Sequence, residues 1–70
     1  MRKPPCFLKW IRRQTHRDDP VGGVSKDAVA DPHFPAVGGW REAQTYVGYR
    51  GGAAAEQALA KAVAEWKAMK

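Results

Sequence analysis

The chain has 70 residues, of which 12 are basic and 7 acidic, and its formal net charge is +5. A chain this short buries little surface, so we expect one small domain over residues 1–70, with residues 1–5 as a flexible N-terminus. The single cysteine excludes an internal disulfide, and no apolar run is long enough to span a membrane. No apolar stretch follows the basic start as in a secretion signal, so we expect a cytoplasmic protein without membrane association.

The positive charge is concentrated at the start of the chain. The first 17 positions hold six basic residues and no acidic one, and the remainder is close to neutral. Basic helical segments contact phosphate backbones by displacing counterions. The candidate contacts to an anion or to nucleic acid are Lys9, Arg12, Arg13 and Arg17. The alternative is a solvated helix face whose arginine stems cover apolar surface.

The first two helices are predicted from their start signals. Pro4-Pro5 suits a first helical turn because proline needs no N–H partner there. Apolar residues follow at helical spacing from Phe7, and Thr15-His16-Arg17 is expected to end this helix. Asp18-Asp19-Pro20 then indicates an N-cap and a second helix, which Asp31-Pro32 ends. Because glycine costs about 1 kcal/mol relative to alanine inside a helix, Gly22-Gly23 predicts a short helix with a loose first turn.

Two further helices are predicted after a turn-rich connection over residues 31–39. The third starts near Gly39-Trp40 and runs to about Tyr49, and the fourth covers about Ala53 to Ala68. The apolar stripe of the fourth helix is expected to extend to Met69. No segment alternates like a strand, so we expect an all-α, compact bundle of four to five short helices. The predicted core comprises Phe7, Trp10, Ile11, Val24, Phe34, Trp40, Tyr46, Val47, Leu59, Val63 and Trp66.

Three tryptophans fall on three different predicted helices. We expect Trp10, Trp40 and Trp66 to meet in one core together with Phe34, because buried aromatic rings stabilise a small domain strongly. Two alternatives stay open: one tryptophan is half exposed as a binding anchor, or Phe34 is an exposed aromatic contact.

Reactive side chains are sparse. His16 and His33 lie in predicted turns, and no Cys or His pair has zinc-ligand spacing, so we expect no metal, no cofactor and no catalytic residue. Cys6 precedes an apolar run without a base nearby, and we expect a small core thiol. The glycine pairs match no phosphate-binding motif.

Taken in order, these segments resemble the YozE-like family of small bacterial and phage proteins. The resemblance spans about Phe7 to Lys67 and rests on the aromatic first helix, on residues 17–22, on Asp27 and Asp31, on the Phe34-Pro35 and Tyr46-Val47 pairs, and on the final helix with Ala58, Leu59 and Ala64-Glu65-Trp66. Gly23 and Val47 depart from its pattern, which commonly has an acidic residue and a leucine there. The resemblance implies a fold similar to the sterile alpha motif domain and little about function.

Two functions follow as hypotheses. The favoured one is a non-enzymatic module that binds an unidentified protein, including a bacterial or phage regulator of another protein. The alternative is nucleic-acid binding through the basic first helix. Folds similar to the sterile alpha motif serve both roles, so the fold alone does not choose between them.

Overall fold

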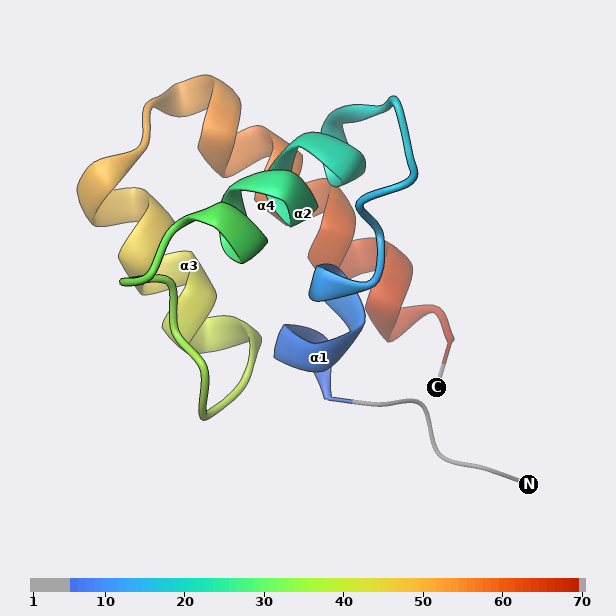
Figure 1. The fold of residues 1–70 in the computed structure, drawn as a ribbon, viewed down its shortest axis with the longest axis horizontal. Coiled ribbons are helices and arrows are strands. Elements are labelled where there is room, and N and C mark those ends of the chain that lie inside the picture. The colour runs from blue at the N-terminus through green and yellow to red at the C-terminus, as the bar shows by residue number, and fades with distance from the viewer. Residues whose placement is uncertain (1–5, 70) are drawn as a thin grey trace.

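The computed structural model describes residues 6–69, which form four helices and no strand (Figure 1). They are α1 (Phe7–Arg12), α2 (Pro20–Ala30), α3 (Trp40–Arg50) and α4 (Ala53–Lys67). The predicted all-α bundle is therefore confirmed. The expected flexible N-terminus and the helix-opening role of Pro4-Pro5 lie outside the described residues. Within residues 6–69, no helix is long and apolar enough to cross a membrane.

Helix α4 is the element against which the other three helices pack. It contacts α1, α2 and α3, and α1 also contacts α2 and α3. Between α2 and α3, both described in full, no pair of Cα atoms lies within 8 Å. Figure 1 shows α3 beside α2 with α4 running behind α2, and the separation of α2 from α3 positions the candidate site.

Phe7 is the aromatic centre of the core. Its ring lies 5.9 Å from the ring of Trp10 and 5.9 Å from the ring of Trp66, with an edge-on arrangement to the second. Both tryptophans are buried, so two of the three predicted tryptophans fill the core with Phe7 between them. The buried apolar residues are Phe7, Leu8, Trp10, Ile11, Val21, Val24, Ala28, Phe34, Ala43, Leu59, Ala62, Val63 and Trp66.

The third tryptophan does not join this core. Trp40 is only partly buried because it is the first residue of α3, at the edge of the bundle, where Lys67 and Arg41 lie against its ring. Tyr46 and Val47 were also predicted to be core residues and are likewise partly buried, since they face the space between α2 and α3. These three side chains form the edge of the core rather than its interior.

Two further expectations about burial are wrong. Cys6 is exposed, because it occupies the extended N-cap position of α1 and therefore lies before the apolar stripe of that helix begins. Met69 is 49% exposed because α4 ends at Lys67 and carries its apolar stripe no further. Helix α1 is also shorter than its apolar spacing suggests, ending at Arg12.

The first turn of α2 is closed by a side-chain cap and a backbone hydrogen bond, where a loose turn was expected. The Asp19 carboxylate accepts a hydrogen bond from the Gly22 N–H at 2.9 Å, and Pro20 occupies the first helical position. A Cβ atom at Gly22 would lie 2.0 Å from the carbonyl oxygen of Arg17. Gly22 thus lets the chain entering α2 cross close to the helix, a role that its helix propensity does not reveal.

Candidate interaction surface

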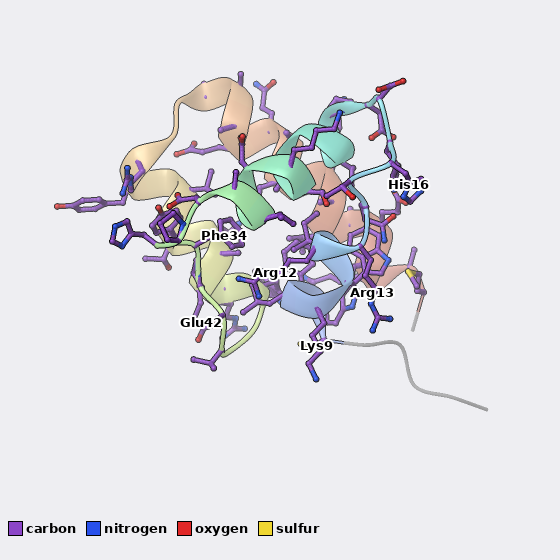
Figure 2. The ribbon with its side chains drawn as sticks, in the orientation of Figure 1. Lys9, Arg12, Arg13, His16, Phe34 and Glu42 are labelled. Carbon is purple, nitrogen blue, oxygen red and sulfur yellow. The ribbon has the colours of Figure 1, made fainter. Side chains whose placement is uncertain are left out.

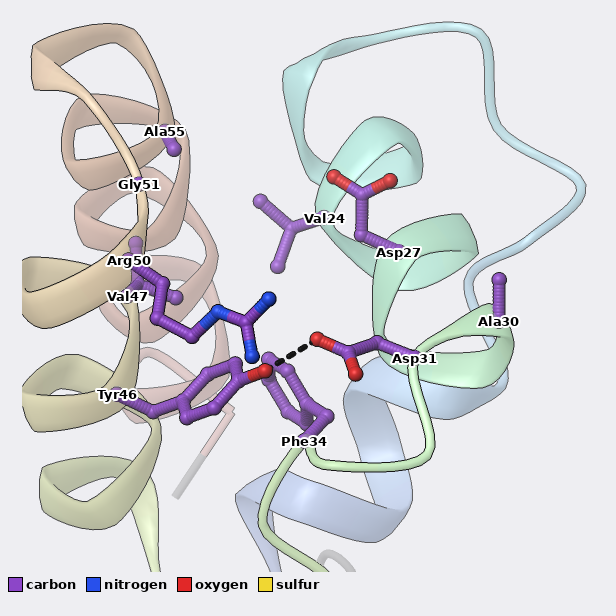
Figure 3. A pocket seen from close by; sticks show the side chains of 10 residues that line it. All are labelled: Val24, Asp27, Ala30, Asp31, Phe34, Tyr46, Val47, Arg50, Gly51 and Ala55. Atoms are coloured by element: carbon purple, nitrogen blue, oxygen red, sulfur yellow. Dashed lines mark hydrogen bonds between the residues drawn. The ribbon is translucent and has the colours of Figure 1, made fainter.

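A groove separates α2 from α3. It has a volume of about 430 Å³. Its apolar floor is supplied by Val24 of α2, Phe34 of the connecting loop, Val47 of α3 and Ala55 of α4 (Figure 3). We call it the α2–α3 groove; its lining is completed by Asp27, Ala30, Asp31, Tyr46, Arg50 and Gly51.

The loop that supplies Phe34 is fixed from both sides. The guanidinium of Arg12 donates a hydrogen bond to the carbonyl oxygen of Pro35 at 3.1 Å, which ties the loop to α1. The ring of Phe34 packs edge-on against that of Tyr46, with the ring centres 5.6 Å apart. Phe34 is buried, so its ring belongs to the floor of the groove and to the core at once.

A hydrogen-bond network spans the groove from α3 to the end of α2. The Tyr46 hydroxyl donates to the Asp31 carboxylate, whose other oxygen accepts from the His33 N–H at 2.9 Å (Figure 3). The bond from Tyr46, followed by the bond from His33, lowers the pKa of Asp31. The same contact with Asp31, together with partial burial, raises the pKa of the Tyr46 phenol. The network therefore holds a charged carboxylate and a neutral phenol across the groove at neutral pH.

Arg50 borders the groove on the side of α3. Its guanidinium carbon lies 5.5 Å from the centre of the Tyr46 ring, over which the planar group stacks. Figure 3 shows the guanidinium projecting toward the space between Tyr46 and Val24. Among residues 6–69, no carboxylate oxygen lies within 4.0 Å of Arg50, although its positive charge helps to lower the pKa of Asp31 across the groove.

A second, shallower hollow adjoins the groove along α3. It has a volume of about 650 Å³ and shares Tyr46 and Arg50 with the groove. We call it the tyrosine face, lined by His33, Arg41, Glu42, Thr45, Tyr46, Tyr49 and Arg50. Tyr49 is 91% exposed, although a large aromatic ring left in water is unusual. Together the two hollows form one continuous surface rich in tyrosine and arginine.

The four basic residues predicted to contact an anion do not form one free patch. Lys9 and Arg13 are exposed on α1 and at its C-cap, whereas Arg12 is held by Pro35 (Figure 2). Arg17 is engaged on both sides: its guanidinium donates to Asp19 at 2.6 Å and to Glu65 of α4 at 2.6 Å. These bonds raise the pKa of Arg17 and fasten the segment between α1 and α2 to α4.

The remaining candidate reactive residues are not brought together. His16 and His33 are exposed in two different connections, and Cys6 is exposed at the start of α1. Within the described part of the chain, no group of three or more His, Cys, Asp or Glu side chains is arranged to hold a metal ion.

Four residues of this surface were not predicted from the sequence to be site residues: Asp31, Arg41, Tyr49 and Arg50. Asp31 was predicted only to end the second helix, and the segment after Tyr49 was predicted to be a break between two helices. The available signal was the spacing of Tyr46, Tyr49 and Arg50, which places aromatic and guanidinium groups on neighbouring positions of one helix. The role of Asp31 could be recognised only in the folded structure, because 15 positions separate it from its partner Tyr46 in the sequence.

No family model, no curated protein and no solved structure matches this chain.

Proposed function

We propose that this protein is a non-enzymatic module that binds another protein through the α2–α3 groove and the tyrosine face. The observation that carries the proposal is Tyr49, 91% exposed beside Arg50 and next to an apolar groove. Tyrosine, tryptophan and arginine dominate the binding energy of protein interfaces because they combine large contact area with hydrogen-bonding groups. A cytoplasmic location belongs to the same proposal, since the exposed thiol of Cys6 suits a reducing compartment.

The experiment that tests the proposal is affinity capture from the source cell, with Tyr49→Ala and Val37→Ala as matched variants. Both residues are exposed, Val37 by 82%, so neither substitution should unfold the domain. Val37 lies outside both hollows and serves as the control. We expect at least one protein that the unmodified chain and the Val37→Ala variant retain and that the Tyr49→Ala variant loses. A set of captured proteins that is identical for all three would refute the proposal.

Nucleic-acid binding remains the second candidate because Lys9 and Arg13 are exposed and unpaired among the described residues. The two residues are four positions apart and can follow one phosphate backbone. The test is titration of labelled duplex and single-stranded DNA and RNA at two salt concentrations. Binding that falls steeply with salt and is lost when Lys9 and Arg13 become alanine supports this function. Absence of binding at low salt refutes it.

The resemblance to the YozE-like family, with the sterile alpha motif-like fold that it implies, stays a prediction. It agrees with a small helical module but does not identify the partner.

A further inference from the structure

We infer that the partner presents an acidic segment with an apolar anchor, whose large apolar side chain enters the α2–α3 groove while its carboxylates pair with Arg50 and Arg41. This inference rests on the proposed protein-binding function and adds the chemistry of the partner. It follows from the apolar floor of the groove and from the distribution of free and engaged charges around it.

The groove is suited to one large apolar side chain. Its volume of about 430 Å³ falls within the roughly 300–1,000 Å³ typical of sites that enclose small ligands. Val24, Phe34, Val47 and Ala55 supply a floor without a charged group. An aromatic or leucine side chain placed there would lose its contact with water and gain contacts with Phe34 and Val24.

The carboxylates of this surface are mostly engaged. Asp31 accepts hydrogen bonds from Tyr46 and His33. The Glu42 carboxylate accepts from the Gly39 N–H at 2.7 Å and so caps the start of α3. Both carboxylates keep lone pairs for a further donor, but each is already partly satisfied by these internal hydrogen bonds. Asp27, exposed on the wall formed by α2, is the exception.

The cations of the same surface form no ion pair among residues 6–69, although Arg50 helps to lower the pKa of Asp31 and Arg41 that of Glu42 from a greater distance. Arg41 and Arg50 each lie against the face of an aromatic ring, at 5.2 Å from Trp40 and 5.5 Å from Tyr46. Stacking holds a guanidinium in place and leaves the N–H donors along its edge for a carboxylate, which they bind in a fork. Among residues 6–69, neither side chain has a carboxylate oxygen within 4.0 Å. The net charge of +5 further favours encounter with acidic partners.

The probe for the test is a random 12-residue peptide library displayed on phage and selected on the folded protein. We expect enriched peptides that place Asp or Glu within a few positions of Leu, Phe or Trp. Synthetic copies, labelled with a fluorophore, are then titrated by fluorescence anisotropy. Arg50→Ala should weaken their binding about tenfold, Arg41→Ala about threefold, and Asp27→Asn should strengthen it about twofold, as expected for interface charges.

Arg13→Ala is the matched control, since it removes an exposed arginine outside this surface and lowers the net charge equally. It should leave the affinity within a factor of two. If Arg13→Ala and Arg50→Ala lowered the peptide affinity equally, the binding would depend only on overall charge, and the inference would be overturned. Enriched peptides that need Tyr49 but carry no acidic excess would overturn the inference and leave the proposed function standing. If no peptide depends on Tyr49 or Arg50, or if the protein captures only further copies of itself, both are overturned.

Discussion

Alanine at Gly22 and alanine at Gly23 should change the stability of the domain in opposite directions. Both glycines lie in the first turns of α2, so helix propensity predicts a gain of about 1 kcal/mol for either substitution. Their surroundings differ. A Cβ at Gly23 meets no atom within 4 Å, whereas a Cβ at Gly22 lies 2.0 Å from the Arg17 carbonyl oxygen and 2.6 Å from its carbon.

In the Gly22→Ala variant, the backbone must shift to relieve the overlap with the new Cβ, because the clashing atoms belong to the peptide group of Arg17 before α2. Overpacking of a close contact costs about 1–3 kcal/mol, and an overlap this severe falls at or above the upper end. After the gain in propensity is subtracted, Gly22→Ala should destabilise by about 2 kcal/mol, while Gly23→Ala should stabilise by about 1 kcal/mol. In a domain of this size these values correspond to a Tm lower by about 8–16 °C and higher by about 4–8 °C.

The assay is thermal and urea unfolding followed by circular dichroism at 222 nm, with both variants measured beside the unmodified chain. The pair serves as its own control, since the two substitutions are chemically identical and adjacent. If Gly22→Ala proved as stable as Gly23→Ala, the close crossing of Arg17 over α2 would be wrong, and with it the geometry that delivers Arg17 to Glu65.

Three further predictions concern the core and the start of α2. Ser25→Ala should raise the free energy of unfolding by about 1 kcal/mol in urea titrations, because the Ser25 hydroxyl is buried and has no hydrogen-bond partner among the described residues; no gain would mean that it is satisfied. Phe7→Ala should abolish cooperative unfolding, because it removes about 3–5 kcal/mol from a domain whose whole stability is about that large. The Phe7→Leu variant should stay folded. A sharp unfolding transition of the Phe7→Ala variant near the Tm of the unmodified chain would contradict the central role of Phe7 in the core. Hydrogen bonds from Gly22 and Arg17 lower the pKa of Asp19 in the folded state. The stabilisation of the fold by the ionised Asp19 carboxylate is therefore complete above its pKa in the unfolded chain, about 3.9, and is lost as the pH falls through its lower pKa in the folded chain. Asp19→Asn keeps a capping oxygen but no charge, so its urea midpoint should fall less than that of the unmodified chain between pH 6 and pH 2; parallel curves would refute the role of this carboxylate.

The parts of the fold that the sequence predicted are those encoded within a few residues. The capping pair Asp19 and Pro20 marked the start of α2 correctly, and Asp31 before Pro32 marked its end. The glycines after Arg50 separated α3 from α4. In each case the signal is a backbone preference of the residue itself or a hydrogen bond to a neighbour along the chain.

The parts that escaped prediction depend on pairs distant in sequence. Arg17 and Glu65 are 48 positions apart, and nothing in the local pattern distinguishes an arginine that binds a carboxylate from one that faces solvent. Trp40 has the helical spacing of a core residue and yet lies at the edge, because α3 begins there and two cations cover its ring. Spacing identifies which face of a helix is apolar, but not how deeply each position is buried.

Contacts between residues distant in sequence also change the interpretation of the positive charge at the start of the chain. The basic residues of the first 17 positions suggested an electrostatic surface on α1, but Arg12 holds the Phe34 loop and Arg17 joins the chain to α4. Their guanidinium groups are therefore used to build the groove and the fold around it. The arginines with free donors beside an apolar groove, Arg41 and Arg50, come from the part of the chain that is close to neutral overall. In the proposed interaction, net charge would attract an acidic partner to any face, whereas the stacked guanidiniums of α3 would select where it docks.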